Sequence, residues 1–196
     1  MHVALFGAAF DPPHLGHAQV AEGLLELGLV DEVRYLPVNN HPFHKTMSAV
    51  EHRLAMLKLL LSHSQQSFSL GHHITIDDYE LHKNDLNYSY DTLRFFRQQN
   101  PEHTFSWVIG ADNIESFSKW HFYQELLREF KVYVYPRPGF AMKALLPGME
   151  ALTGVTEVNI SSTQIREHIQ QGHSIAQLVP QAVAQYIQTH RLYLCS

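Results

Sequence analysis

The sequence predicts an α/β protein: a Rossmann-like, doubly wound parallel sheet with a small helical portion at its C-terminal end. Short apolar runs alternate along the chain with longer segments whose leucines and alanines recur at helical spacing. This alternation is typical of βαβ units, which build parallel sheets with helices on both faces. At 196 residues and 45% hydrophobic content, the chain is long enough for one core, so we expect a single domain over residues 1–196.

The elements follow one another in a regular order. A strand is expected at 3–6, a helix at 17–27, a second strand at 33–38 and a long helix at 50–61. Further strands are expected at 74–76, 105–109, 132–135 and 155–160, and further helices at 89–99, 123–130, 163–171 and 180–189. Gly172 suits the end of one helix and Pro180 the start of the last. The stretch 137–154, rich in Gly, Pro and Met, is expected to be the loosest part of the chain.

Composition excludes several function classes. A net charge of −5 argues against a nucleic-acid partner, because the chain has no basic stripe to neutralise phosphates in bulk. A single cysteine, Cys195, allows no disulfide framework and no thiolate metal cluster, which fits a reducing cytoplasm. The chain enters a strand directly and has no apolar stretch of about 18 residues, so neither export nor membrane spanning is expected.

The junction between the first strand and the first helix looks built to hold phosphate. Its sequence is Gly7-Ala8-Ala9-Phe10-Asp11-Pro12-Pro13-His14-Leu15-Gly16-His17. Small residues let a polyanion approach the backbone, and the start of the helix offers unpaired N–H groups and a positive dipole end. His14 and His17 would reach the same anion from the side. With fifteen histidines in the chain, two of them three residues apart could be accidental, but two prolines and a glycine would be costly there without a required loop shape.

A second candidate phosphate site lies near the other end of the chain. Ile160-Ser161-Ser162-Thr163-Gln164-Ile165-Arg166 combines a Ser/Thr-rich helix start with an arginine on the first turns. Hydroxyl and N–H groups there suit phosphate oxygens, and Arg166 adds a bidentate, permanently charged donor. Alone, this segment would more simply be a capped helix with a surface arginine; two such segments in one chain favour a shared polyanion.

These two segments resemble the H-x-G-H and I-S-S-T-x-I-R signatures of the nucleotidyltransferase superfamily. Over nearly the full chain, the resemblance narrows to the bacterial nicotinate mononucleotide adenylyltransferases. The matching segments are Pro42-Phe43-His44-Lys45, Arg53 on the following helix, Asn87-Tyr88-Ser89-Tyr90-Asp91-Thr92-Leu93, Ile109-Gly110-Ala111-Asp112-Asn113, Trp120-His121 and Arg137-Pro138-Gly139.

The resemblance implies a single nucleotidyltransferase domain that transfers an adenylyl group from ATP to nicotinate mononucleotide, giving deamido-NAD and pyrophosphate. It implies magnesium arriving with ATP, no resident metal, and leaves a homodimer open. The implied phosphate contacts are His14, His17, Lys45 and Arg166. The implied ATP contacts are Gly7, Ala8, Ala9, Phe10, Gly16, Ile160, Ser161, Ser162 and Thr163. The implied acceptor contacts are Asn40, Ser89, Asp112, Trp120, His121 and Arg137, with Trp120 stacking on the pyridine ring.

The chain departs from the family pattern at one informative place. Family members carry G-G-[ST]-F where this chain has Gly7-Ala8-Ala9-Phe10, so a hydroxyl that faces the phosphates is missing at Ala9. Two alternatives therefore stand beside the leading one: the same reaction on nicotinamide mononucleotide or another phosphorylated acceptor, and a paralogue that binds nucleotide without turnover. The remaining histidines show no metal-ligand spacing, and the charged stretch 77–83 is interpreted as structural.

Overall fold

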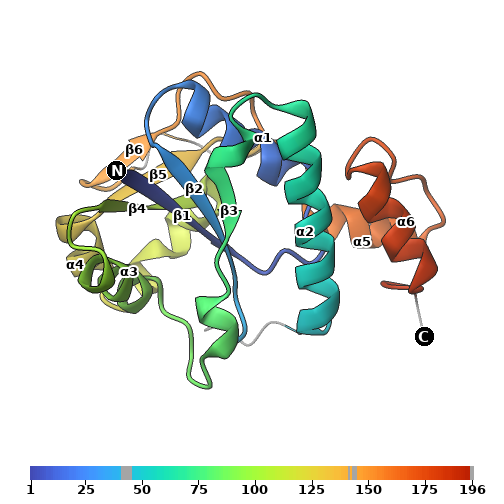
Figure 1. The fold of residues 1–196 in the computed structure, drawn as a ribbon, viewed down its shortest axis with the longest axis horizontal. Helices are drawn as coiled ribbons and strands as arrows, with labels where there is room; N and C mark the ends of the chain where they lie inside the picture. The colour runs from blue at the N-terminus through green and yellow to red at the C-terminus, as the bar shows by residue number, and fades with distance from the viewer. Residues whose placement is uncertain (41–45, 141, 143–144, 195–196) are drawn as a thin grey trace.

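One six-stranded sheet organises the molecule. The computed structural model describes residues 1–40, 46–140, 142 and 145–194. All strand pairs are parallel, in the order β3-β2-β1-β4-β5-β6 (Figure 1). The strands are β1 (His2–Ala8), β2 (Glu32–Pro37), β3 (Ile74–Ile76), β4 (Thr104–Gly110), β5 (Lys131–Tyr135) and β6 (Met149–Ala151). The order reverses between β1 and β4, which confirms the predicted doubly wound sheet and places its topological switch point there.

Helices cover both faces of the sheet. The α-helices are α1 (Leu15–Glu26), α2 (Val50–Ser67), α3 (Ser89–Gln99), α4 (Tyr123–Glu129), α5 (Ser162–Gln170) and α6 (Gln181–Thr189). Side chains alternate along β1, so Ala4 and Phe6 join a core with α1 and α2, while Val3 and Leu5 join a core with α3 and α4. No helix in the described ranges is long and apolar enough to cross a membrane.

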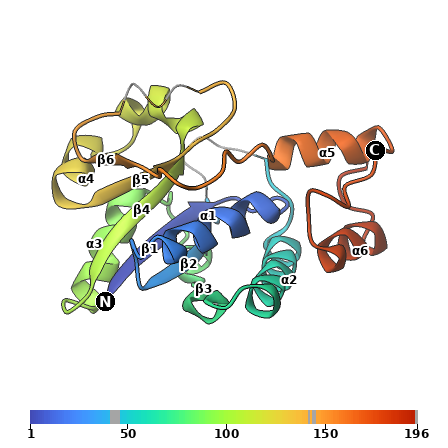
Figure 2. The same ribbon diagram turned by 90° about the horizontal axis from the view of Figure 1, so that it is seen from above.

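The C-terminal helices form a separate small core on α2. Met56 of α2 packs with Ile165 of α5 and with Val183 and Ile187 of α6, away from the sheet (Figure 2). This arrangement confirms the predicted C-terminal helical portion. Three short 3-10 helices complete the described elements: η1 (Gly71–His73), η2 (Tyr79–His82) and η3 (Ala111–Lys119). The sequence did not predict η3, which leads from the end of β4 to Trp120.

The predicted strand at 155–160 is wrong. The sixth strand is β6, which lies inside the stretch expected to be loosest and pairs with β5 from Val132 opposite Met149. The segment 155–160 carries apolar residues for a different reason: a side chain on Gly23 or Gly16 of α1 would meet Val155 or Val158. Its apolar pattern therefore reflects packing on a helix and not pairing in the sheet.

A buried polar network ties the loop after β1 to the rest of the chain. Asp11 accepts hydrogen bonds at its carboxylate from the Tyr193 hydroxyl (2.6 Å) and the Ser48 N–H (2.9 Å). Arg53 of α2, fully buried, donates to the carbonyls of Ala9 (2.8 Å) and Ser48 (3.0 Å). Buried polar groups of this kind are stable only while their partners remain, so the loop has a fixed shape.

Replacing Arg53 by Met should therefore destabilise the fold. The part-buried carbonyls of Ala9 and Ser48 would each lose a hydrogen bond from a charged donor, worth about 1.5–3 kcal/mol, so we expect the free energy of unfolding to fall by roughly 3 kcal/mol. Chemical denaturation followed by circular dichroism measures it. Lys58→Met, on the exposed side of the same helix, removes a cation of similar length and should leave stability nearly unchanged; equal losses in the two variants would contradict the assignment.

Candidate active site

The two predicted phosphate motifs meet at the carboxyl ends of the central strands. The first motif follows β1 and ends in α1, for which His14 is the N-cap residue with an extended backbone. The second leads into α5, and the Ser161 hydroxyl accepts from the Gln164 N–H (3.1 Å), as its capping role requires. In open parallel sheets ligands bind at this edge, beside the switch point.

His14 and His17 lie stacked and buried at the start of α1. Their ring centroids are 3.7 Å apart with an interplanar angle of 25°. Burial lowers the pKa of His17 to about 3, and the nearby Arg137 charge adds to the effect. The pKa of His14 also lies well below its ordinary value, mainly because the ring is buried and further because of the charges of His17 and Arg137. Both imidazoles are therefore neutral at neutral pH.

The neutral state fixes where His17 holds its proton. The His14 N–H donates to Nδ1 of His17 (3.2 Å), so Nδ1 is an acceptor and the proton sits on Nε2. An Nε2–H group is a donor of the kind that a phosphate oxygen needs. Nδ1 of His14 is buried and has no partner among the described residues.

Gly16 allows this pair to form. A side chain at this position would collide with Val158 and press on the His14 ring. The glycine in the motif thus has a packing reason, because it lets the first turn of α1 approach the segment after β6 closely.

The two motifs are bonded directly to each other. Arg166 donates through Nη1 to the Asp11 carbonyl (2.7 Å) and through Nη2 to the Thr163 hydroxyl (3.1 Å). The Ser162 hydroxyl donates to the Pro12 carbonyl (2.9 Å). These bonds bring Arg166 and the N-terminus of α5 against the loop that carries the histidines.

Arg137 lies near both the histidine pair and Asp112. It donates to the Ile160 carbonyl (2.6 Å), and its Nε lies 3.6 Å from Asp112 Oδ1. Its charge acts on both histidines. The sequence associated Arg137 with the acceptor; in the structure it lies between the histidine pair, the second motif and Asp112.

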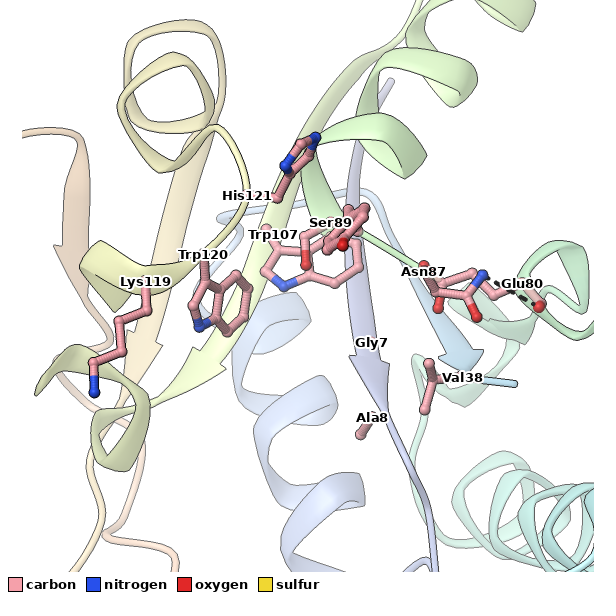
Figure 3. Close-up of a pocket in the computed structure, with 11 residues that line it drawn as sticks. Gly7, Ala8, Val38, Glu80, Asn87, Ser89, Trp107, Lys119, Trp120 and His121 are labelled. Atoms are coloured by element: carbon pink, nitrogen blue, oxygen red, sulfur yellow. Dashed lines mark hydrogen bonds between the residues drawn. The ribbon is translucent and has the colours of Figure 1, made fainter. Parts of the chain in front are cut away.

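A pocket of about 250 Å³ opens beside the end of β1 (Figure 3). Its wall contains five of the predicted site residues: Gly7, Ala8, Ser89, Trp120 and His121. It also contains residues that the sequence analysis did not single out as ligand contacts: Val38, Glu80, Asn87, Tyr88, Trp107 and Lys119. The pocket is aromatic on one side and polar on the other.

Stacked rings hold the aromatic side of the pocket. Trp120 stacks on Phe117 (centroids 4.9 Å apart, 27°), and His121 stacks on Tyr88 (4.3 Å, 28°). Trp107 of β4 lies against Gly7, where any side chain would overlap its indole ring. Trp107 was not predicted as a pocket residue, because an aromatic residue inside an apolar strand is typical of ordinary core.

Glu80 is the acidic residue of the pocket wall and is almost completely buried, with 3% of its surface exposed. The Thr92 hydroxyl donates to its Oε1 (2.7 Å), and the Asn87 amide donates to its backbone carbonyl (3.4 Å). Burial raises the pKa of Glu80 to about 7, against the opposing effects of Thr92 and Lys83. This burial was not predicted, because Glu80 lies in the charged stretch 77–83.

Asn40 does not line the pocket. Its side-chain amide donates to the carbonyls of Asn84 (2.9 Å) and Lys83 (3.4 Å), while its N–H donates to Asn87 Oδ1 (2.9 Å). Asn40 therefore holds the loop that presents Asn87 to the pocket. Lys45, the remaining predicted phosphate contact, lies outside the described residues.

The described residues contain no group of three or more His, Cys, Asp or Glu side chains that could hold a metal ion. The donors near the histidine pair are instead guanidinium, imidazole, hydroxyl and backbone N–H groups. Guanidinium, hydroxyl and N–H donors of this kind suit an anion.

Comparison with known proteins places this architecture in a family. Residues 5–168 match the cytidylyltransferase-like family model. The probable nicotinate-nucleotide adenylyltransferase of Oceanobacillus iheyensis is 35% identical over 97% of this chain and 96% of its own length. That of Geobacillus thermodenitrificans is 36% identical over 97% of this chain and 85% of its own.

A solved structure shows the same fold. The nicotinic acid mononucleotide adenylyltransferase of Plasmodium falciparum, complexed with NaAD, superposes with a TM-score of 0.87 at 21% identity, over 98% of this chain and 97% of the other. Because the family model spans most of the sequence and curated relatives match it along most of their length, the chain belongs to the cytidylyltransferase-like family and, within it, to the nicotinate-nucleotide adenylyltransferases.

Proposed function

We propose that this protein transfers the adenylyl group of ATP to nicotinate mononucleotide, forming deamido-NAD and releasing pyrophosphate. One observation carries the proposal. The end of β1 belongs to both halves of the site: Gly7 and Ala8 form part of the aromatic pocket, and the loop that follows them carries the histidine pair. A ring bound in the pocket would thus lie next to a triphosphate bound at the two motifs.

The reaction needs alignment more than covalent help. The 5′-phosphate of the acceptor attacks the α-phosphorus of ATP, and pyrophosphate leaves in line, so positioning and charge stabilisation supply most of the acceleration. His14 and His17 would donate to the phosphates as neutral imidazoles, and Arg166 and Arg137 would offset negative charge. Lys45 is proposed as a further phosphate contact from the sequence.

The remaining ATP contacts follow from the two motifs. We assign backbone contacts to Gly7, Ala8, Ala9, Phe10 and Gly16 and to the start of α5 at Ile160, Ser161, Ser162 and Thr163. Magnesium bound to ATP would supply further neutralisation of the triphosphate, and the anion-binding character of the described donors fits a metal that arrives with the nucleotide.

The acceptor would occupy the aromatic pocket. Trp120 offers a flat face for the pyridine ring, a contact worth on the order of 1 kcal/mol beyond area burial. The ring substituent would meet donors near Ser89 and His121, and Asp112 would lie toward the ribose. Asn40 would act through the loop that it holds rather than by touching the ligand.

The absence of a hydroxyl at Ala9 does not favour a non-catalytic paralogue. The Ala9 carbonyl is held by the buried Arg53 guanidinium at 2.8 Å, so the loop keeps its shape through its backbone. Alanine at this position therefore removes only the one hydrogen bond that a hydroxyl there would make with phosphate.

Pyrophosphate release tests the proposal directly. With ATP and magnesium, we expect turnover with nicotinate mononucleotide and much weaker turnover with nicotinamide mononucleotide. His17→Ala should lower kcat/KM by at least about 100-fold, since it removes a donor that aligns the phosphates. His72→Ala, which changes an exposed histidine, is the matched control. ATP binding without any pyrophosphate release would favour the non-catalytic alternative.

The buried histidines also predict how stability depends on pH. The pKa of His17 lies near 3 in the folded chain and near 6.5 in the unfolded one, so the unfolded state binds more protons between these values. Neutral His17 therefore adds its full contribution to the free energy of unfolding above about pH 6.5. As the pH falls toward 3 this contribution is lost, by about 1.4 kcal/mol per pKa unit and by a few kcal/mol in all. Denaturation of the ligand-free protein from pH 7 to 4 should show a smaller decline for His17→Gln than for wild type. A decline of equal size would contradict the buried, neutral state; His72→Gln should leave it unchanged.

A further inference from the structure

The polar side of the acceptor pocket contains one carboxyl group, that of Glu80, among its described lining residues. Lys119 and His121 are the basic side chains among these lining residues. Glu80 comes from η2, on the side of the pocket opposite Trp120 and Lys119 in Figure 3. Ligands in the pocket would therefore lie between an aromatic wall and a buried acid.

Several groups surround the Glu80 carboxyl. Thr92 of α3, with no exposed surface, donates to Oε1 at 2.7 Å. Lys83, at the end of η2, favours the charged form of Glu80, whereas Asp77, after β3, favours the neutral form. The Tyr79 hydroxyl is a further titratable neighbour within η2. No described cation is within salt-bridge distance of this carboxyl.

This setting makes the charge of Glu80 matter for an acidic ligand. Burial outweighs the Thr92 hydrogen bond and holds the pKa of Glu80 at about 7, so the group changes charge near neutral pH. Two carboxylates in one desolvated pocket disfavour each other, as like charges do at any shared site. A neutral carboxyl imposes no such repulsion and offers a donor.

We propose that Glu80 sets the preference of the acceptor pocket between an anionic and a neutral ring substituent: its protonated form admits the carboxylate of nicotinate mononucleotide, and its ionised form disfavours it. This inference rests on the proposed function. It makes Glu80 a specificity-determining residue, in contrast to the purely structural role that its sequence context suggests.

The test is the ratio of kcat/KM for nicotinate mononucleotide to that for nicotinamide mononucleotide, measured from pH 6 to pH 8. Where nicotinamide mononucleotide turns over too slowly, its inhibition constant against nicotinate mononucleotide takes the place of its kcat/KM in the ratio. Both acceptors carry the same phosphate and the same pyridinium charge, so the ratio isolates the ring substituent. With a group of pKa near 7 that must be protonated, the ratio should fall about tenfold across this range.

Two variants assign the effect to Glu80. Glu80→Gln keeps an oxygen for Thr92 and cannot ionise, so its ratio should stay at the wild-type value of pH 6 at every pH. Thr92→Val removes the hydrogen bond that favours the charged form, and the midpoint of the fall should move to higher pH. Glu102→Gln, which removes an exposed carboxylate, should reproduce the wild-type curve.

The outcomes separate the two proposals. A wild-type ratio that does not change with pH, or a Glu80→Gln variant that keeps the wild-type fall, would overturn the inference while leaving the adenylyltransferase activity intact. If Glu80→Gln does not fold, an unmoved midpoint in Thr92→Val overturns it. Absence of pyrophosphate release with both acceptors would overturn the proposed function and this inference with it.

Discussion

The site depends on the buried carboxylate and carbonyl of Asp11. This residue sits in the loop after β1 and accepts hydrogen bonds from three separate parts of the chain: Ser48 before α2, Arg166 of α5, and Tyr193 near the C-terminus. The C-terminal helices otherwise rest on α2 and not on the sheet (Figure 2). Asp11 thus helps to hold the segment 160–166 against the loop after β1, together with the hydrogen bond from Ser162 to the Pro12 carbonyl.

Close backbone approach builds the remainder of the site. The Trp107 ring lies against Gly7 of β1, where a side chain would overlap it, and Gly16 lets the His14 ring and Val158 meet at the start of α1. The first contact lies beside the pocket, and the second lies beside the histidine pair. Together the two glycines leave the β1–α1 junction free of side chains where its neighbours approach.

The sequence predicted most elements and the two motifs that the structure brings together, because those signals are local. The Ser161 cap, the start of α3 at Ser89 and the glycine between the histidines are each written in a few consecutive residues. The strand expected at 155–160 was wrong since valines that pack on a helix show the same pattern as valines in a strand. Glu80, Asp11 and Trp107 were missed as contributors because their importance comes from partners 12 to 182 positions away or from burial that composition does not reveal.

Burial of titratable groups determines their charge at the candidate site. Both imidazoles of the histidine pair are neutral at neutral pH, with the pKa of His17 lowered to about 3, and burial raises the pKa of Glu80 to about 7, so burial favours the uncharged form of all three groups. The Arg137 and Arg166 guanidinium groups remain charged and donate to backbone carbonyls, and Arg137 also lies 3.6 Å from Asp112 Oδ1. An uncharged buried acid or base costs far less than an unpaired ion. Under the proposed function, the phosphates of the two substrates would meet the Arg137 and Arg166 charges, and the pyridine ring would lie beside the protonatable Glu80.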